Sequence, residues 1–479
     1  MKMKKILSGI LIMAGTLITA CDEILDVNTD PNNPSTSTPQ LTLPVAQVSL
    51  ATVMETDYNI LGSMLAQYWT TGPTAAQYDF IDKYNIRTTD FDNAWTFVYS
   101  TVLSDLEFVR TFGIENEQPN YTAIAQLLQA YTYQILVDLY DKIPYSEALQ
   151  GKNGNVAAQF ENGNEIYDDL IIKIDEALDL IDTAPGAIAP GNDDLIYGGD
   201  MTLWQKFGNT LKLKIYIRQA LARPEVSQAG IAELYEEGAD FLLPGEDAKI
   251  QFSANVQNEN PFWQELNQTS LENLVASETS LDTLIANNDL RLESLYDPST
   301  EGDQYTGLPQ GIGTQDGGSF DDYAHPDLTT IVNRAAPSFL ITGYESLFLQ
   351  AEAAQRGWST QDDSELYNAA VLASFTFWNK SGDAFVAPGG AYEYDGNLET
   401  IYYQKWLAFN GEQGLEGWLE WRRTGVPALP LSIQGRPLSN KFPLRLIWPN
   451  TERSANPNVP PIENVDVPVW WDTTISQPK

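Results

Sequence analysis

The sequence predicts a mostly α-helical protein, built from antiparallel helix pairs of the tetratricopeptide kind and joined by long irregular loops. Apolar residues recur every three or four positions in several segments, which is the period of a helix that buries one face. Small residues such as Ala123, Ala125 and Ala130 fall at positions that favour close approach of neighbouring helices. Stretches rich in Gly, Asn and Asp separate the helical segments.

Capping residues and helix breakers set the expected helix ends. The segments with a helical period are 124–139, 165–185, 202–222, 341–356, 366–378 and 398–423. Asn120 and Asp200 are placed to cap the first and third segments, and Pro144 ends the first. Gly357 stands where a C-terminal glycine belongs, and Gly425 stops the last segment.

The connections between these helices are unusually long. Three of them, 186–199, 252–259 and 297–326, are rich in residues that favour turns, and such loops in a compact body are usually functional or disordered. After Gly425 the chain is irregular and punctuated by prolines. We expect this tail to wrap around the helices.

The first 20 residues have the pattern of a secretion signal. Three lysines precede an apolar run that ends at Ile18, and this run is shorter than the about 20 residues of a membrane-spanning helix. Ile18-Thr19-Ala20-Cys21 resembles a bacterial lipobox, which predicts lipidation of Cys21; ordinary secretion with a chance cysteine is the alternative. Residues 21–40 are rich in Asn, Pro, Ser and Thr and predict a flexible tether before a ligand-binding body at 41–479.

Composition excludes several classes of partner and site. The chain has 65 acidic and 27 basic residues, so its electrostatic field repels nucleic acid and anionic lipid. Attachment to a membrane must therefore come from the acyl chains on Cys21 and not from a basic surface. Cys21 is the only cysteine, which excludes an internal disulfide and a thiolate metal site. His325 is the only histidine, which argues against a zinc site or a histidine triad. We expect no cofactor and no metal.

The sequence contains no motif that specifies catalysis. A glycosidase needs two carboxylates about 5–10 Å apart across a sugar, and adjacent pairs such as Asp168-Asp169 or Asp321-Asp322 do not present that geometry. The segment 297–303 superficially resembles a calcium loop but lacks the alternating ligands and the terminal glutamate. We therefore predict no catalytic residue, with a secreted α-helical glycoside hydrolase as the alternative.

Aromatic residues beside polar turns are the candidate ligand contacts. A rigid ring with polar neighbours suits a sugar face or a peptide side chain, because it offers a large contact area at low entropic cost. The opposing interpretation is that these rings pin their loops to the helical body. Because three separate loops carry such rings, we predict ligand binding by Trp69, Tyr78, Tyr84, Trp263, Tyr305 and Tyr323.

Several segments, in the same order along the chain, resemble the SusD/RagB family of surface nutrient-binding lipoproteins. The matching segments are Phe91–Trp95, Leu136–Ala148, Pro337–Ala353, Glu416–Gly425, Pro443–Leu446 and Asn456–Asn458. Most of their residues look structural: Trp95, Trp418 and Trp421 fall on helical periods typical of core positions. Glu352 and Arg422 form either a buried pair between two helices or part of a solvated face.

The resemblance implies a SusD-like helical fold and a non-catalytic protein on the outer surface of the outer membrane. It also implies a partner, a SusC-like TonB-dependent outer-membrane transporter, over which this chain closes as a lid. The family includes importers of glycans and of peptides. Trp69 and Trp263 stand near loop boundaries, which favours oligosaccharide, and a peptide-binding importer subunit is the alternative.

Overall fold

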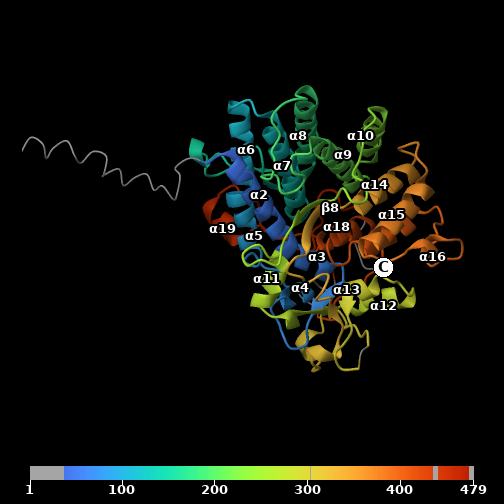
Figure 1. The fold of residues 1–479 in the computed structure, drawn as a ribbon. Helices are drawn as coiled ribbons and strands as arrows, with labels where there is room; N and C mark the ends of the chain where they lie inside the picture. Colours follow the sequence, from blue (N-terminus) through green and yellow to red (C-terminus); the bar gives the residue numbers. More distant parts are fainter. Residues whose placement is uncertain (1–36, 303, 435–440, 474–479) are drawn as a thin grey trace, which may run out of the picture.

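The computed structural model describes residues 37–302, 304–434 and 441–473, and this part of the chain is mostly helical (Figure 1). The predicted leader, Cys21 and most of the predicted tether lie outside the described residues. The first described helix begins at Pro39, inside the range assigned to the tether. Within the described ranges, no helix has the length and apolar character needed to cross a membrane.

Helices follow one another along the chain with short strands between them. The first helices are α2 (Pro39–Val53), α3 (Asn59–Leu65), α4 (Asp79–Asp82), α5 (Asp92–Phe97), α6 (Ser104–Glu115), α7 (Pro119–Tyr140), α8 (Gly163–Thr183), α9 (Met201–Arg218) and α10 (Pro224–Glu236). The others are α11 (Pro261–Gln268), α12 (Glu278–Ala286), α13 (Leu292–Leu295), α14 (Gly343–Gln355), α15 (Asp363–Phe377), α16 (Asp383–Val386), α17 (Leu398–Ala408), α18 (Gly414–Thr424) and α19 (Asn450–Ala455). Two π-helical turns, η1 (Met54–Tyr58) and η2 (Val98–Leu103), join α2 to α3 and α5 to α6.

The strands form two-stranded antiparallel ladders between distant parts of the chain. The pairs are β1 (Trp69–Thr71) with β5 (Leu274–Ala276), β2 (Ile143–Pro144) with β3 (Phe160–Glu161), β4 (Ala248–Gln251) with β8 (Pro337–Ile341), and β6 (Tyr296–Asp297) with β7 (His325–Pro326). Short 3₁₀ turns lie at η3 (Gly151–Asn153), η4 (Leu271–Asn273), η5 (Gly313–Gln315) and η6 (Phe320–Asp322). Each ladder therefore fastens a loop to the helical body.

Most of the predicted helices are confirmed, with three corrections. Asn120 lies inside α7 and its side chain donates to the Ala187 carbonyl, so it is not a cap. Ile341 belongs to β8, and α14 begins two residues later. The segment 398–423 is two helices, because the chain breaks at Gly411, whose φ is +100°. Asp200 caps α9 as predicted, accepting from the backbone of Thr202 and Leu203.

Helices α6 to α10 stand side by side at one end of the molecule, and α14 and α15 form another close pair (Figure 1). Only three residues separate α6 from α7, so these two helices run antiparallel. The tail lies across them as expected: Leu446 donates its backbone N–H to the Leu139 carbonyl, and the Trp471 indole donates to Asp138. Trp95, Trp418 and Trp421 are buried, which confirms their core assignment.

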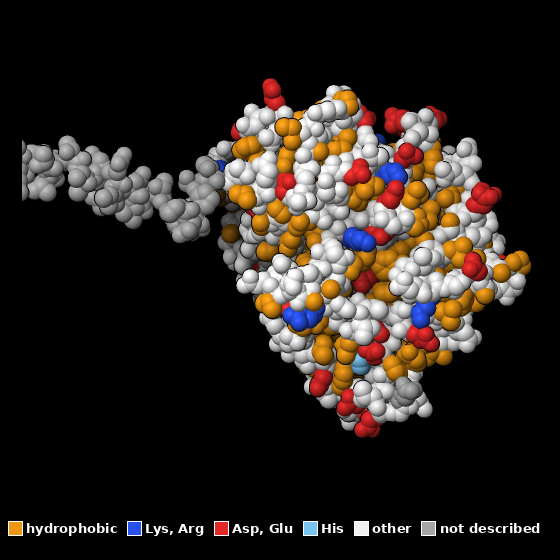
Figure 2. All heavy atoms as spheres, viewed as in Figure 1, with side chains coloured by type: hydrophobic (Ala, Val, Ile, Leu, Met, Phe, Trp, Pro, Cys, Tyr) orange, Lys and Arg blue, Asp and Glu red, His pale blue; other side chains and the backbone are white. Residues whose placement is uncertain are grey.

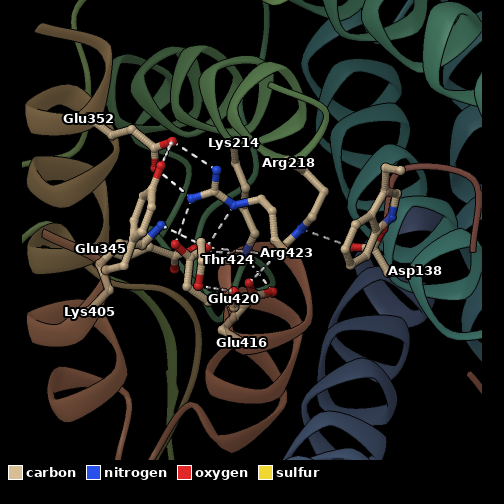
Figure 3. Close-up of polar contacts among 12 residues, drawn as sticks. Asp138, Lys214, Arg218, Glu345, Glu352, Lys405, Glu416, Glu420, Arg423 and Thr424 are labelled. Carbon is tan, nitrogen blue, oxygen red and sulfur yellow. Dashed lines mark hydrogen bonds and ion pairs between the residues drawn. The ribbon is translucent and has the colours of Figure 1, made fainter. Parts of the chain in front are cut away.

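A network of buried charges joins five of these helices (Figure 3). Lys214 of α9 contacts Glu345 of α14 and Glu416 of α18, each at 2.8 Å. Arg423 of α18 lies 2.6 Å from both Glu352 and Glu420. The network continues to α7 and α17 through the pairs Arg218–Asp138 and Lys405–Glu420.

These contacts settle the partner of Glu352. The carboxylate pairs with Arg423 and Arg356, and the predicted partner, Arg422, instead donates to the Asp138 carbonyl. Burial raises the pKa of Glu352, but the neighbouring charges of Arg423 and Arg356 lower it further, so the net pKa lies below its usual value. Glu352 is therefore ionised in the folded protein at neutral pH.

Two buried carboxylates next to this network have no cation. Glu55 on η1 is 3% exposed and Glu412 between α17 and α18 is 7% exposed, and neither forms an ion pair within the described ranges. Burial raises the pKa of Glu55 to about 7, although hydrogen bonds from Ser338 and Asn260 oppose the shift. Burial and then the charge of Glu55 raise the pKa of Glu412 well above its ordinary value.

Glu55 should make the protein less stable as pH rises. The folded-state pKa of Glu55 exceeds the unfolded value of about 4.3. The protonated side chain therefore makes its full contribution to the free energy of unfolding below about pH 4.3, and this contribution is lost as the pH rises through 7. Glu55→Gln keeps the shape but cannot ionise. We expect this variant to match wild type below about pH 4 and to exceed it by on the order of 3 kcal/mol at pH 8.

Urea unfolding of both proteins across this pH range measures the difference. Glu399→Gln, which changes an exposed carboxylate, is the control and should follow wild type. A Glu55→Gln profile parallel to wild type at every pH would contradict the assignment.

Candidate ligand-binding site

The loops that carry the predicted ligand contacts meet at one end of the molecule, away from α6 to α10 (Figure 1). β1 pairs with β5 in the register Trp69 to Ala276 and Thr71 to Leu274. Leu308, from the long 297–326 loop, donates its backbone N–H to Ala276 and accepts from Glu278. Three segments far apart in the sequence therefore run side by side.

One buried carboxylate, Asp82 of α4, fastens these segments together. It accepts from the Thr70 hydroxyl at 2.8 Å, the Thr71 N–H at 2.7 Å and the Gln310 amide. Burial raises the pKa of Asp82 to about 6, with these hydrogen bonds opposing the shift. Its own backbone carbonyl accepts from the Ser432 hydroxyl, which ties the tail to the same point.

Trp69, Tyr78 and Tyr84, three of the predicted contact residues, all belong to the buried core. Trp69 is 0% exposed and stacks on Phe262, with ring centroids 5.3 Å apart and planes 4° from parallel. Tyr84 is 3% exposed and its hydroxyl accepts from the Ser432 N–H. The faces of both rings are covered by protein, so the structure corrects the prediction that they contact ligand. They pin their segments to the body.

Tyr78 does line a recess, which we call the Tyr78 hollow. It has a volume of about 230 Å³ and lies between η1, α4, α5 and α11. Aromatic and aliphatic side chains form part of its wall, and hydroxyl, amide and carboxylate groups form the rest. The lining residues are Thr56, Asp57, Ile60, Gln77, Tyr78, Phe80, Ile81, Asp90, Phe91 and Glu265.

Hydrogen bonds fix the polar side of the hollow. The Tyr78 hydroxyl donates to Glu265 Oε1 at 2.8 Å, and Asn273 donates to the Gln77 side chain at 3.3 Å. Burial and the charge of Glu265 raise the pKa of Asp57. Burial, followed by the same charge, raises the pKa of Tyr78, which therefore stays a hydroxyl donor. The hollow offers rings beside carboxylate and amide oxygens that can accept hydrogen bonds.

Trp263 lies on the same helix as Glu265 but does not line the hollow. Its backbone N–H donates to the Asn260 side chain, which caps α11. The guanidinium of Arg334 sits over its ring at 4.9 Å from the centroid, and Glu259 pairs with Arg334. The indole is half-buried. It remains a proposed contact at the border of the site.

Tyr305 and Tyr323 lie together on the long loop between β6 and β7. The backbone N–H of Ala324 donates to the Thr306 carbonyl, which brings the two tyrosines close. Tyr323 donates its hydroxyl to Asp316 at 2.6 Å, and both rings are half-buried. The structure joins these two residues to each other and does not place them in the Tyr78 hollow.

Sequence analysis missed most residues of the hollow. Asp57 and Glu55 are the only charged residues between Thr42 and Trp69, and such isolated charges in an apolar run are a signal that could have marked η1. The π-helical geometry itself has no sequence signature here, although π turns are frequent at functional sites. Phe91 was assigned to a structural motif, and its ring faces the hollow as well as the core.

The surface of the protein carries many acidic side chains. Figure 2 shows acidic side chains distributed over the visible face, with basic side chains at a few isolated positions. Among the described residues, no three His, Cys, Asp or Glu side chains form a group that could hold a metal ion. The arrangement can accept hydrogen bonds from a neutral ligand and cover part of it with rings.

The described part of the chain is a helical protein with tetratricopeptide-like helix pairs, and its candidate site lies between helices and the loops that adjoin them. The family model described as "Starch-binding associating with outer membrane", a SusD-like family, matches residues 31–449. The chain belongs to this SusD-like family, as its sequence motifs indicated. None of the curated protein sequences compared with the chain matches it.

Solved structures share the fold along nearly the whole chain. A SusD homologue from Bacteroides uniformis is 23% identical, with a TM-score of 0.76 and coverage of 90% of this chain and 99% of its own. A SusD/RagB family protein from Bacteroides thetaiotaomicron is 21% identical, with a TM-score of 0.77 and coverage of 91% and 99%. A chitin-binding SusD homologue from Flavobacterium johnsoniae is 20% identical, with a TM-score of 0.73 and coverage of 90% and 99%. These likenesses confirm the SusD-like fold.

Proposed function

We propose that this chain is a non-catalytic lipoprotein of the cell surface that binds oligosaccharide nutrients and delivers them to a SusC-like TonB-dependent outer-membrane transporter. The family description and the chitin-binding structural relative support a carbohydrate ligand. The observation that carries the proposal is the Tyr78 hollow, in which rings stand beside fixed hydrogen-bond acceptors. Tyr78 and Glu265 are its central residues, whereas Trp263, Tyr305 and Tyr323 stay proposed contacts that do not line the hollow.

The chemistry of the hollow favours sugar over peptide. Sugar hydroxyls donate hydrogen bonds, and Asp57, Asp90 and Glu265 supply carboxylate acceptors. An extended peptide would instead need backbone donors and acceptors along a groove or sheet edge. Phe80 and Phe91 lie edge to face at 6.1 Å and provide an apolar wall against which a sugar ring can pack.

One observation favours hydrolysis as a second candidate function. Asp57 and Glu265 line the same recess, and burial together with the charge of Glu265 raises the pKa of Asp57. A carboxylic acid with a raised pKa beside an ionised carboxylate is the arrangement that glycosidases use. Release of reducing ends by wild type that is lost in Asp57→Asn would establish hydrolysis and overturn the non-catalytic proposal.

Binding in the hollow should depend on Glu265. Glu265→Gln keeps the side-chain shape but replaces a charged acceptor, so we expect affinity for the bound glycan to fall about tenfold. Calorimetric titration with chitin and starch oligosaccharides, and with a peptide library in parallel, measures the effect. Glu272→Gln, an exposed carboxylate at the same end of the molecule, is the matched control and should bind like wild type.

Two tryptophan variants, measured in the same titration, distinguish a residue of the core from a proposed ligand contact. Trp263→Ala should weaken binding with little loss of stability, whereas Trp69→Ala should lose about 3–5 kcal/mol of stability, because it empties a buried site. Peptides that bind while every glycan fails would contradict the oligosaccharide proposal. Normal glycan binding by both Glu265→Gln and Trp263→Ala would show that the site lies elsewhere.

Anchoring should depend on Cys21. Without acyl chains a strongly acidic chain has no affinity for a membrane, so Cys21→Ser should leave the outer-membrane fraction when the transporter is absent. Fractionation followed by immunodetection compares the variant with wild type. Equal amounts of both proteins in the outer membrane would contradict the lipid anchor.

The proposed transporter should stay with this chain during gentle purification. Family members are expected to close as a lid over a barrel, which requires one broad and stable interface. Detergent extraction with a tag on this chain should recover a large outer-membrane barrel protein in near-equal amount, as quantified by mass spectrometry. Recovery of the tagged chain alone would favour a free-standing binding protein.

A further inference from the structure

A second recess lies between α6, α7 and α8 and shares no residue with the Tyr78 hollow. We call it the α7 recess; its volume is about 280 Å³. In Figure 1 these helices stand at the end of the molecule away from α4 and α11. Its lining is Glu107, Arg110, Gln126, Gln129, Ala130, Tyr133, Tyr145, Ser146, Ala148, Leu149, Gln150, Asp169, Leu170 and Lys173.

Internal hydrogen bonds hold the polar walls of the α7 recess in place. Glu107 accepts from Arg110 at 2.8 and 2.9 Å and from the Gln129 amide at 3.0 Å. The Tyr145 hydroxyl donates to Asp169 at 2.7 Å. The Arg110 and Gln129 bonds, against the opposing effect of burial, lower the pKa of Glu107, so this carboxylate is ionised. A wall fixed in this way loses little entropy when a ligand binds.

Several groups in this wall retain hydrogen-bonding capacity. The Gln126 amide donates to the Lys173 carbonyl at 2.7 Å, yet among the described residues its oxygen, like that of Gln129, accepts no hydrogen bond. Nor does the Tyr133 hydroxyl form a hydrogen bond within the described ranges, although its ring is 7% exposed. Within those ranges, the Lys173 ammonium group donates only to Glu176. Donors and acceptors therefore both face the recess.

The formal charges of the recess cancel. Glu107 and Asp169 are matched by Arg110 and Lys173, in a chain with more than twice as many acidic as basic residues. A cation or an anion would gain little from such a wall. A neutral ligand with hydroxyl groups, each of which donates and accepts, matches it.

Two further features shape the recess for a compact ring. Tyr133 and Tyr145 meet edge to face, with centroids 4.8 Å apart and planes at 84°, and so form an aromatic corner. Leu149 at the rim has φ of +62° and is the only aliphatic residue among the described non-glycine residues with positive φ. Such backbone strain is concentrated at functional sites.

We propose that the α7 recess is a second sugar-binding site, which takes one neutral sugar residue against the Tyr133–Tyr145 corner. Its ligand is a free monosaccharide or one residue of a longer neutral glycan, held through Gln126, Gln129, Tyr133 and Lys173. The recess does not depend on the Tyr78 hollow, because the two sites share neither residues nor helices.

Saturation-transfer NMR of the purified chain with glucose, galactose, mannose and N-acetylglucosamine tests this site. Tyr133→Phe removes only a hydroxyl that has no hydrogen-bond partner in the described part of the chain, and should weaken binding of the best sugar about three- to tenfold with stability unchanged. Tyr140→Phe is the matched control: this core hydroxyl, on the same helix, also lacks a hydrogen-bond partner among the described residues, and its loss should not change binding. Lys173→Met should weaken binding to a similar degree, while Lys152→Met, outside the recess, should not.

The remaining outcomes assign any observed binding to one site. Glu265→Gln should leave the α7 signal intact; loss of all sugar binding in that variant would place it in the Tyr78 hollow and overturn the proposal. If none of the four sugars receives saturation from the protein, the proposal is also overturned. The same holds if Tyr133→Phe and Tyr140→Phe bind the best sugar with equal affinity. Tighter binding of glucuronate, glucosamine or glycylglycine than of the neutral sugars would reject a neutral ligand.

Discussion

The buried charge network between α7, α9, α14, α17 and α18 is the interaction on which the rest of the fold depends. Several pairs in Figure 3 join two different helices, such as Lys214 with Glu345 and Glu416 and Arg423 with Glu352, so these contacts specify how the helices are placed. Loss of one partner from a buried pair costs about 3–5 kcal/mol, because an uncompensated charge stays behind. The network therefore strongly disfavours any arrangement of these helices that separates its charges.

The loops that carry the candidate contacts are joined to one another and to the helical body by specific buried contacts. Asp82 holds β1, the 297–326 loop and the tail at one point, and Trp69 stacked on Phe262 adds apolar contact between β1 and α11. The Tyr78 hollow lies beside these joints and contains the π turn η1. The candidate contacts of the hollow thus lie on helices and adjoining loops that a stable scaffold positions, which is how binding sites are commonly built.

Sequence alone predicted the parts of this structure that depend on local pattern. Helical periods and caps such as Asp200 identified most helices, because the residues on the core face of a helix recur every three or four positions in the sequence. Trp69 was assigned wrongly, because its burial comes from pairing with β5 and stacking on a residue almost 200 positions away. Glu352 was matched to Arg422 instead of the adjacent Arg423, since one residue along a helix changes the direction of a side chain by about 100°. Neither recess could be predicted, because each depends on how several helices pack together: η1, α4 and α11 around the Tyr78 hollow, and α6, α7 and α8 around the α7 recess.

The burial of basic residues also shapes what the surface can bind. Of the 27 basic residues, at least seven have side chains no more than 4% exposed: Lys214, Arg218, Arg291, Lys405, Arg422, Arg423 and Arg445. The surface is therefore more acidic than composition alone suggests. Salt screens such a field beyond about 8 Å but not within a recess, so an anionic ligand would be repelled at the point of contact. A neutral glycan avoids that cost, and the charges that stabilise the interior thus favour an uncharged ligand outside.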